Sequence, residues 1–308
     1  MKIIDGHAHV IERIAGFGRR GELRPLGGGR ARWANGLEIQ LIPPELGDRS
    51  FTAEALLGVL DAHRVERAVL LQGSFYGFQN EYSAEAARVH PGRFLAAGTF
   101  DPFCVDRDEI LERLLGALAL RIVKLELSTG GGLMGFHAPF PLDGPLLAEP
   151  VERIAAAGAT LVLDLGGPWM ASFQPEAVAR LARRHPGLRI VICHLLAPGP
   201  GDEAALRRGL EALAPVENVW FDLAALPWNV APEAYPYPTA RRYAALARGL
   251  VGATRLIWGS DAPSATTADS YRRLLDYLVQ APGWTAPDLE LVLHDSACQA
   301  YPGLGREA

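Results

Sequence analysis

The feature of this sequence that most limits its possible folds is a regular alternation of short apolar runs with helical segments. Each run is rich in Val, Leu and Ile, and the segments between the runs carry apolar residues at helical spacing. The runs cover residues 68–72, 94–100, 121–127, 160–166, 189–195, 219–224 and 255–261, and the helical segments cover 83–90, 107–118, 146–157, 175–184, 203–213, 239–250 and 268–279. A first strand within residues 2–10 and a helix over 52–65 bring the count to roughly eight β/α units.

Eight such units predict an α/β fold in which parallel strands close into a (β/α)8 TIM barrel. The alternative is a doubly wound open sheet, which favours a glycine-rich phosphate turn after the first strand, and residues 5–9 do not form one. Residues 11–50 are rich in Gly, Arg and Pro and predict a long loop after the first strand. No linker interrupts the pattern, so we expect a single domain over residues 1–308.

The first strand carries the segment Asp5-Gly6-His7-Ala8-His9. Period-two alternation places Asp5, His7 and His9 on one side of this strand. Two imidazoles at the tip of one strand can converge on a cation, and neutral imidazole is a common ligand of zinc and other transition metals. One buried and one surface histidine would give the same pattern, so this motif alone does not establish a metal site, and the prediction depends on polar residues elsewhere in the chain.

Ionisable residues also occur at the ends of the later predicted strands. They are Lys124 and Glu126 on the fourth strand, Asp164 on the fifth, His194 on the sixth, Asp222 on the seventh and Asp261 on the eighth. Barrel enzymes carry their catalytic groups at these carboxyl ends, and buried ionisable groups are costly unless they are paired or bind a metal. A salt bridge or a loop cap explains each of them singly, but together they predict one shared polar site.

Several of these segments resemble landmarks of the amidohydrolase superfamily. They are Asp5-Gly6-His7-Ala8-His9, His90-Pro91-Gly92-Arg93-Phe94, Ile122-Val123-Lys124-Leu125, Cys193-His194-Leu195, Asn218-Val219-Trp220-Phe221-Asp222-Leu223 and Trp258-Gly259-Ser260-Asp261-Ala262-Pro263. They follow the family's order over nearly the whole chain. The sequence is most similar to the amidohydrolase-related branch that includes aminocarboxymuconate-semialdehyde decarboxylase, resorcylate decarboxylases and pyrone-dicarboxylate lactonase.

The resemblance implies a divalent metal, most often zinc, held by His7, His9 and Asp261, with His194 beside it. Metal-binding members usually carry a histidine on the fifth strand, where this chain has Asp164, whose carboxylate can also bind zinc. A site with two histidines and two carboxylates could instead prefer manganese or iron. Glu126 is a second candidate ligand, because some members use an acidic residue at the end of the fourth strand. A metal-free site is the remaining alternative, since the branch includes a lactonase that works without a metal.

The main functional prediction is a metal-dependent hydrolase that acts on a small ester, lactone or amide through a metal-activated water. Asp261 would accept the proton of that water and later deliver it to the leaving group, while His194 and Lys124 would stabilise the oxyanion. The alternative is non-oxidative decarboxylation of an aromatic or unsaturated carboxylic acid, as several relatives perform. A barrel that binds a ligand without catalysis is a third hypothesis, which only Asp164 favours.

The loops after the strands indicate the kind of small-molecule substrate. Aromatic residues there are Phe75, Tyr76 and Phe78 after the second strand, Trp169 after the fifth and Trp228 after the seventh. They predict an apolar or ring-bearing substrate, although core packing explains any one of them equally well. The arginines of the long loop are Arg13, Arg19, Arg20 and Arg24. They could hold a carboxylate of the substrate, although solvated loop charges explain most of them better.

Composition excludes several classes of partner. The net charge of −5 gives no reason to expect nucleic acid or an anionic membrane surface. No apolar run approaches the ~18 residues of a membrane span, and the first residues lack a signal-peptide pattern. Three widely spaced cysteines do not suggest a disulfide framework and favour a cytoplasmic setting. A homo-oligomer is compatible with all of these features.

Overall fold

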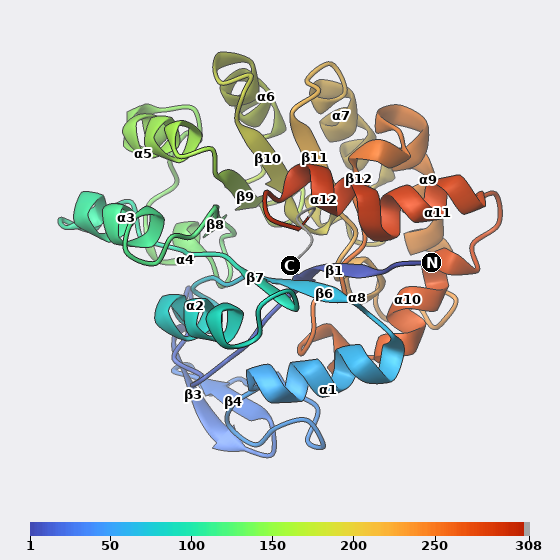
Figure 1. The fold of residues 1–308 in the computed structure, drawn as a ribbon, viewed down its shortest axis with the longest axis horizontal. Helices are drawn as coiled ribbons and strands as arrows, with labels where there is room; N and C mark the ends of the chain where they lie inside the picture. Colours follow the sequence, from blue (N-terminus) through green and yellow to red (C-terminus); the bar gives the residue numbers. More distant parts are fainter. Residues whose placement is uncertain (305–308) are drawn as a thin grey trace.

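The computed structural model describes residues 1–304, and parallel strands surrounded by helices form its centre (Figure 1). The strands form one sheet of order β1–β6–β7 and a second of order β12–β11–β10–β9–β8. Their bounds are β1 (Ile4–Ala8), β6 (Arg67–Leu70), β7 (Phe94–Ala96), β8 (Ile122–Glu126), β9 (Thr160–Asp164), β10 (Arg189–Ile192), β11 (Val219–Asp222) and β12 (Leu256–Ile257). All neighbouring strands within these two sheets are parallel.

Backbone hydrogen bonds join the two sheets along both of their open edges. Gly98, just after β7, accepts from the N–H of Lys124 at 2.8 Å and donates to the carbonyl of Ile122 at 2.9 Å. On the other edge, the N–H of Gly6 donates to the carbonyl of Trp258 at 3.0 Å and that of Asp261 donates to His7 at 2.8 Å. The eight strands therefore form a closed ring, which confirms the predicted TIM barrel.

Gly6 permits the close approach at the second of these edges. A Cβ atom at this position would lie 2.4 Å from the Cγ2 of Ile257, well inside van der Waals contact. Only glycine therefore lets β1 lie against β12, the contact that brings the two ends of the sequence together.

Helices follow the strands and cover the outside of the ring (Figure 1). The longer ones are α1 (Ala53–His63), α2 (Asn80–Val89), α3 (Arg107–Leu115), α5 (Pro145–Ala156), α6 (Pro175–Arg184), α7 (Glu203–Leu213), α9 (Pro238–Val251) and α10 (Tyr271–Val279). The shorter ones are α4 (Leu133–Phe136), α8 (Leu226–Asn229), α11 (Ala286–Glu290) and α12 (Ser296–Ala300), with tighter or wider turns at η1 (Cys193–Leu196), η2 (Ala253–Arg255), η3 (Ala265–Thr267) and η4 (Leu291–Asp295).

The local sequence explains where several helices begin. The Thr52 side chain accepts from the N–H of Ala55 at 3.2 Å and caps α1. Pro145, Pro175 and Pro238 occupy the first helical turn of α5, α6 and α9, where a missing N–H costs nothing. Across residues 1–304, no helix has both the length and the hydropathy that crossing a bilayer requires.

The segment that the sequence predicts as a long loop contains a small antiparallel sheet instead. Its strands are β2 (Phe17–Gly18), β3 (Gly21–Gly27), β4 (Arg30–Trp33) and β5 (Glu38–Gln40). In these strands Leu23, Ala31 and Trp33 point into the main core, while charged neighbours face solvent. This alternation is short, and the many Gly and Arg residues make it hard to recognise in the sequence. Gly28 and Gly29, both at positive φ, form the turn between β3 and β4. The prediction of a long loop is therefore wrong for residues 17–40.

A second hydrophobic cluster fills the inside of the barrel and closes one end of it. It combines inward residues of the strands, such as Ile122 and Val162, with Ala297, Ala300 and Tyr301 from the C-terminal part of the chain. The hydroxyl of Thr160, at the start of β9, donates to the carbonyl of Ala300 at 2.6 Å. The amino ends of the strands are therefore blocked, and the inward-facing polar residues further along them open at the other end.

A buried carboxylate fixes the contact between the first and last strands. Asp5 accepts from the N–H and hydroxyl of Ser260 at 2.9 and 2.5 Å, and from the hydroxyl of Tyr271 at 2.8 Å. Burial raises the pKa of Asp5 to about 6, although these hydrogen bonds oppose the shift. A folded-state pKa above the usual value means that Asp5 contributes stability at low pH that is lost as the pH rises through about 6.

We expect Asp5→Ala to lower the free energy of unfolding by about 3 kcal/mol, because it leaves the donors of Ser260 and Tyr271 buried without an acceptor. The loss should be larger at about pH 5 than at about pH 8, where the wild type bears the cost of a buried charge. Urea denaturation at both pH values measures it. Asp106→Ala, which removes an exposed carboxylate, is the matched control. An equal effect of the two substitutions would contradict the role of Asp5.

Candidate active site

The inward-facing polar residues of the barrel meet in one cavity at the carboxyl ends of the strands. The cavity has a volume of about 410 Å³. Its charged floor consists of His9, Lys124, Glu126, Asp164, His194 and Asp261. His7 is completely buried beside this floor, with its Nε2 atom 3.6 Å from Asp261 Oδ1. The structure thus brings together all seven residues that the sequence predicts for the site.

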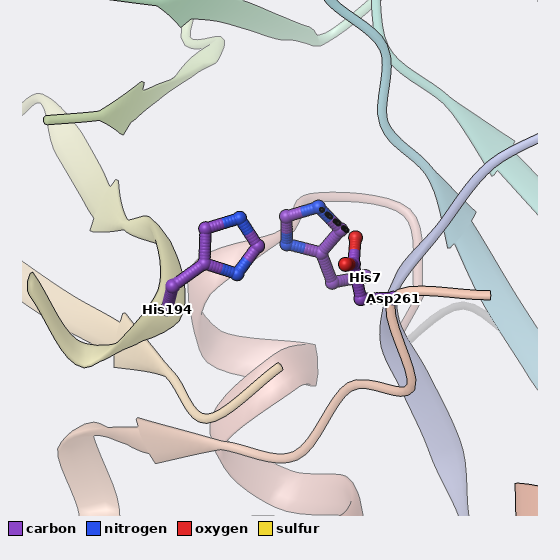
Figure 2. A group of neighbouring side chains, drawn as sticks. All are labelled: His7, His194 and Asp261. Carbon is purple, nitrogen blue, oxygen red and sulfur yellow. Dashed lines mark ion pairs between the residues drawn. The ribbon is translucent and has the colours of Figure 1, made fainter. Parts of the chain in front are cut away.

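His7 is held by a residue from the seventh barrel strand. Its Nδ1 lies 2.9 Å from the Oδ2 of Asp222, and a carboxylate oxygen accepts, so Nδ1 carries the proton. Its Nε2 is buried and has no hydrogen-bond partner among the described residues. Burial lowers the pKa of His7, and the nearby positive charge of Lys124 adds to this effect. His7 is therefore neutral, and the lone pair of Nε2 points toward Asp261 (Figure 2).

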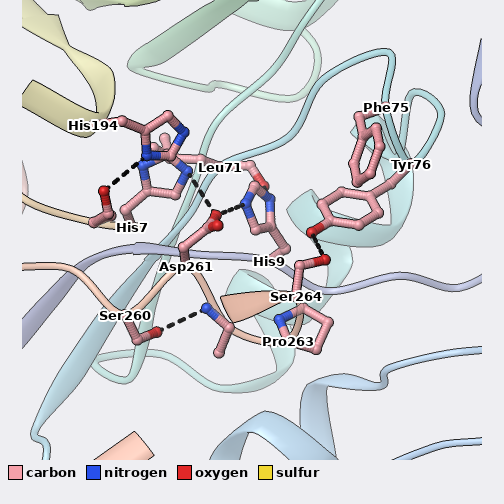
Figure 3. Close-up of polar contacts among 12 residues, drawn as sticks. His7, His9, Leu71, Phe75, Tyr76, His194, Ser260, Asp261, Pro263 and Ser264 are labelled. Carbon is pink, nitrogen blue, oxygen red and sulfur yellow. Dashed lines mark hydrogen bonds and ion pairs between the residues drawn. The ribbon is translucent and has the colours of Figure 1, made fainter. Parts of the chain in front are cut away.

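His9 has the same arrangement with different partners. Its Nδ1 donates to the carbonyl of Leu71 at 2.7 Å, and its Nε2 lies 3.1 Å from Asp261 Oδ1 (Figure 3). Burial lowers the pKa of this imidazole as well, although Asp261 opposes the shift. In the neutral ring the proton on Nδ1 leaves Nε2 as a lone pair that faces a carboxylate oxygen.

The two histidines and Asp261 therefore present three electron-pair donors to one another. Burial favours the neutral carboxyl of Asp261, but the contact with His9 and the positive charge of His194 outweigh it and lower its pKa, so Asp261 is ionised. Two bare ring nitrogens and a carboxylate oxygen repel one another unless a cation lies among them. The orphaned Nε2 of His7 and the oxygen–nitrogen donor set fit a divalent transition metal such as zinc.

His194 lies on the opposite side of His7 and is a further nitrogen within reach. Its ring stacks on that of His7 with centroids 4.7 Å apart, and one ligand atom from each of His7, His194 and Asp261 lies within 4.8 Å of the others. His9, Asp164 and Glu126, which the sequence also offers as ligands, do not belong to this group, although His9 Nε2 lies 3.1 Å from Asp261 Oδ1. Asp164 Oδ2 instead lies 3.5 Å from the Nε2 of His194, and Glu126 Oε2 accepts from the N–H of Phe75 at 3.0 Å.

The backbone at His194 is strained. His194, Leu195, Leu196 and Ala197 all have positive φ, between 45° and 67°. Each such non-glycine residue costs about 1–3 kcal/mol, so the surrounding contacts must hold the segment in place. Asp222 does so by accepting from the N–H of His194 at 2.8 Å, while the ring Nδ1 donates to the carbonyl of Ala224 at 3.0 Å. Asp222 therefore positions both His7 and His194.

The charge on His194 depends on its carboxylate neighbours. Burial disfavours the imidazolium, but Asp164, and then Asp261 and Asp222, outweigh this cost and raise the pKa of His194 to about 10. Burial likewise opposes ionisation of Asp164, yet the charge and hydrogen bond of His194 hold the pKa of that carboxyl well below its usual range. His194 and Asp164 therefore form an ion pair at neutral pH.

Lys124 and Glu126 complete the floor from β8. Burial opposes the charge of Lys124, but Cys193, Asp164 and Glu126 outweigh it and raise the pKa of its ammonium. Burial and the charge of Asp164 raise the pKa of Glu126 to about 7. The floor thus offers two cations, two carboxylates and one carboxyl group that titrates near neutrality.

Asp164→Asn should lower the pKa of His194, because it removes the carboxylate that most favours the imidazolium. In the wild type, the raised pKa of His194 also affects stability. The ion pair with Asp164 stabilises the fold at low pH, and this contribution to the free energy of unfolding is lost as the pH rises through about 10. Titration of the His194 ring by NMR measures the shift. Asp143→Asn, which removes a carboxylate paired with Arg180 instead, should leave the ring unchanged. An unaltered His194 pKa in Asp164→Asn would contradict the pairing.

The sequence predicts the remaining lining of the cavity only in part. Phe75, Tyr76 and Trp228 line it as expected, whereas Phe78 and Trp169 are not among the lining residues. Ile39 and Leu41, at the end of the small sheet, were missed because the segment was predicted to be a loop. The alternation Glu38-Ile39-Gln40-Leu41 is the one local signal that could have indicated a strand there.

The arginines of the first segment do not reach the cavity. Arg13 and Arg24 pair with Glu12 and Glu22 at the surface, and both side chains are well exposed. None of the residues that line the cavity in the described part of the chain is an arginine.

Comparison with known proteins gives relatives in sequence and in structure. L-fucono-1,5-lactonase from Burkholderia ambifaria is 38% identical over 138 residues, a match that spans 42% of this chain and only 43% of that protein. A probable 2-pyrone-4,6-dicarboxylic acid hydrolase from Acinetobacter baumannii, solved with citric acid bound, has a TM-score of 0.70 at 19% identity and covers 97% of this chain and 99% of its own. An amidohydrolase from Burkholderia multivorans with bound zinc has a TM-score of 0.73 at 18% identity and covers 98% and 99%.

These structural relatives share the barrel over almost their full length, and their low identity to this chain supports the fold alone. The family model described as amidohydrolase matches residues 4–303, which include His7 in β1, His9 just after it and Asp261 after β12. This match confirms the resemblance that the sequence motifs indicated. The chain belongs to the amidohydrolase family.

Proposed function

We propose that this protein hydrolyses a lactone or an ester. The observation that carries the proposal is the convergence of two unprotonated imidazole nitrogens, of His7 and His9, on the ionised carboxylate of Asp261. Such a cluster next to a cavity fits the binding and deprotonation of a water molecule. The partial match to a lactonase supports a cyclic ester as the substrate class.

His7, His9 and Asp261 would hold a divalent metal, for which zinc is our first choice. When bound, such an ion lowers the pKa of a water molecule and polarises the substrate carbonyl. The partners of the two rings support this assignment, because Asp222 and the carbonyl of Leu71 fix Nδ1 as the protonated nitrogen and turn Nε2 toward Asp261. His194 is a poorer ligand, because its ion pair with Asp164 keeps the ring protonated.

Side chains of the floor would transfer the proton and stabilise the oxyanion. Asp261 would accept a proton from the attacking water and return it to the alkoxide that leaves. His194 and Lys124 carry positive charge and line the same cavity, so both can stabilise the oxyanion that forms at the carbonyl. Asp164 would act through His194, as the group that keeps it charged.

Three free cysteines also favour a reducing compartment such as the cytoplasm. Cys193 is buried in the core cluster of the barrel, and burial raises the pKa of its thiol, so a structural role fits better than a nucleophilic one.

A direct assay distinguishes hydrolysis from decarboxylation. The purified protein would be incubated with a panel of lactones, esters and carboxylated phenols while proton release and carbon dioxide release are followed in parallel. We expect proton release without carbon dioxide from at least one lactone or ester. Carbon dioxide release as the sole product would replace hydrolysis by decarboxylation, and no turnover of the panel would count against both.

A further inference from the structure

The wall of the cavity above the charged floor is mostly apolar. Ile39 and Leu41 from the small sheet, Phe75 after β6 and Trp228 in α8 form its apolar part. The cavity volume of about 410 Å³ lies in the range that encloses one small ring-bearing molecule. A substrate whose carbonyl reaches the floor would therefore place the rest of its body against hydrocarbon.

The polar side chains of the wall offer no free donor. Both protons of the Gln40 amide are used, since Nε2 donates to the carbonyls of Gly28 at 2.8 Å and Ile42 at 2.6 Å. The hydroxyl of Thr267 donates to the carbonyl of Ser264 at 2.7 Å.

The hydroxyl groups of Tyr76 and Ser264 also donate their protons to acceptors within the protein. The two hydroxyl oxygens are 2.5 Å apart, and Ser264 Oγ donates to the carbonyl of Leu41 at 3.2 Å, so Tyr76 donates to Ser264 (Figure 3). These bonds also tie the small sheet to the loop after β12. The lone pairs of substrate hydroxyls against this wall would find no side-chain donor to replace their bonds to water, which is unfavourable.

The wall also lacks a partner for a negative charge. No arginine lines the cavity within the described chain, and Arg30 and Arg32 on the small sheet pair with Glu38 at the surface. On the floor, His194 already lies against a carboxylate, with its Nε2 3.5 Å from Asp164 Oδ2. Lys124 lines the same cavity as three acidic residues, which are Glu126, Asp164 and Asp261. A carboxylate held against the wall would be desolvated without compensation.

We infer that the site selects an uncharged lactone or ester with an apolar ring or chain, and that it disfavours both polyhydroxylated and carboxylated lactones. The inference rests on the proposed hydrolase function and narrows it to one substrate class. The residues that would choose the substrate are Ile39 in the small sheet, Leu41 just after it and Trp228, which all line the cavity.

Three lactones with six-membered rings test the inference. Dihydrocoumarin is uncharged and aromatic, D-glucono-1,5-lactone carries several hydroxyls, and 2-pyrone-4,6-dicarboxylate carries two carboxylates. We expect kcat/KM for dihydrocoumarin to exceed the kcat/KM for each of the other two lactones by about a hundredfold. Equal or faster hydrolysis of the sugar lactone or the dicarboxylate would overturn the inference and leave the hydrolase proposal intact. Hydrolysis of none of the three, nor of any other lactone or ester, would overturn the hydrolase proposal itself.

A pair of charge substitutions on the small sheet tests where the selectivity arises. Ile39→Arg adds a guanidinium at the cavity, whereas Leu37→Arg adds the same charge two residues earlier at an exposed position outside the lining. Ile39→Arg should lower kcat/KM for dihydrocoumarin about tenfold, mainly through KM, and raise it for the dicarboxylate. Leu37→Arg should change neither. An unchanged selectivity ratio in Ile39→Arg, or an equal change in both variants, would overturn the assignment.

Trp228→Ala provides a second variant in case Ile39→Arg does not fold. Trp228 is 42% exposed, so its truncation should be tolerated by the fold. We expect KM for dihydrocoumarin to rise about tenfold with kcat nearly unchanged, because the indole would contact the substrate body and not the carbonyl. A fall in kcat at constant KM would contradict a role of this wall in binding the substrate body.

Discussion

Replacing Asp261 by Asn is expected to lower kcat by about a thousandfold to ten-thousandfold while the protein stays folded. The substituted amide cannot accept the proton of an attacking water, and it is a weaker ligand for the cation that His7 and His9 would hold with it. Asp261 has a φ of 55°, a left-handed conformation that Asn also tolerates, so the backbone should not change. Initial-rate kinetics on the best lactone of the panel measures the effect.

Asp269→Asn is the matched control for this substitution. Asp269 lies in the same connection after β12, but its carboxylate bonds to Tyr237 and Arg273 and is not part of the cavity lining. Its replacement should leave kcat within about twofold of the wild type. If Asp261→Asn also kept kcat within about tenfold, Asp261 would not be the proton acceptor.

Removal of the proposed divalent metal is expected to have the second largest effect. After treatment with a strong chelator, kcat/KM should fall at least about a hundredfold, because His7, His9 and Asp261 would then face one another without the cation that activates the water. Activity should return on addition of one equivalent of zinc, manganese or ferrous ion, and the ion that restores most activity identifies the preferred metal.

Treatment with the same chelator saturated with calcium controls for effects other than metal removal. Elemental analysis of the treated protein must accompany the assay, so that residual metal is known. Full activity in protein from which the analysis finds all divalent transition metal removed would favour a metal-free lactonase, the alternative that the sequence left open.

Much of the barrel and its floor could be predicted because both depend on local periodicity. On β8, Ile122 packs inside the barrel while Lys124 and Glu126 follow on the same face and line the cavity, as alternation requires. Once the strands were recognised as parallel, the polar residues at their carboxyl ends had to lie close together. The same reasoning located Asp222 at a strand tip, although its contacts with His7 and His194 could not be foreseen.

The rest depends on contacts between distant parts of the sequence. Whether Asp164 binds a metal or pairs with His194 is decided by the left-handed turn after β10, and no local pattern encodes that turn. The small sheet was missed because its strands are short and its alternation is interrupted by Gly28 and Gly29. Consequently the sequence indicated the reactive floor and three aromatic residues of the lining, but not the small sheet that brings Ile39 to the cavity.

The central claim is that His7, His9 and Asp261 form one metal site from the two ends of the chain. A crystal structure of the zinc-loaded protein, with anomalous differences recorded at the zinc edge, tests it most directly. We predict one strong peak at about 2.0–2.2 Å from His7 Nε2, His9 Nε2 and an oxygen of Asp261. Absence of a peak there at full zinc loading, or a peak ligated by Asp164 and Glu126 instead, would contradict the account.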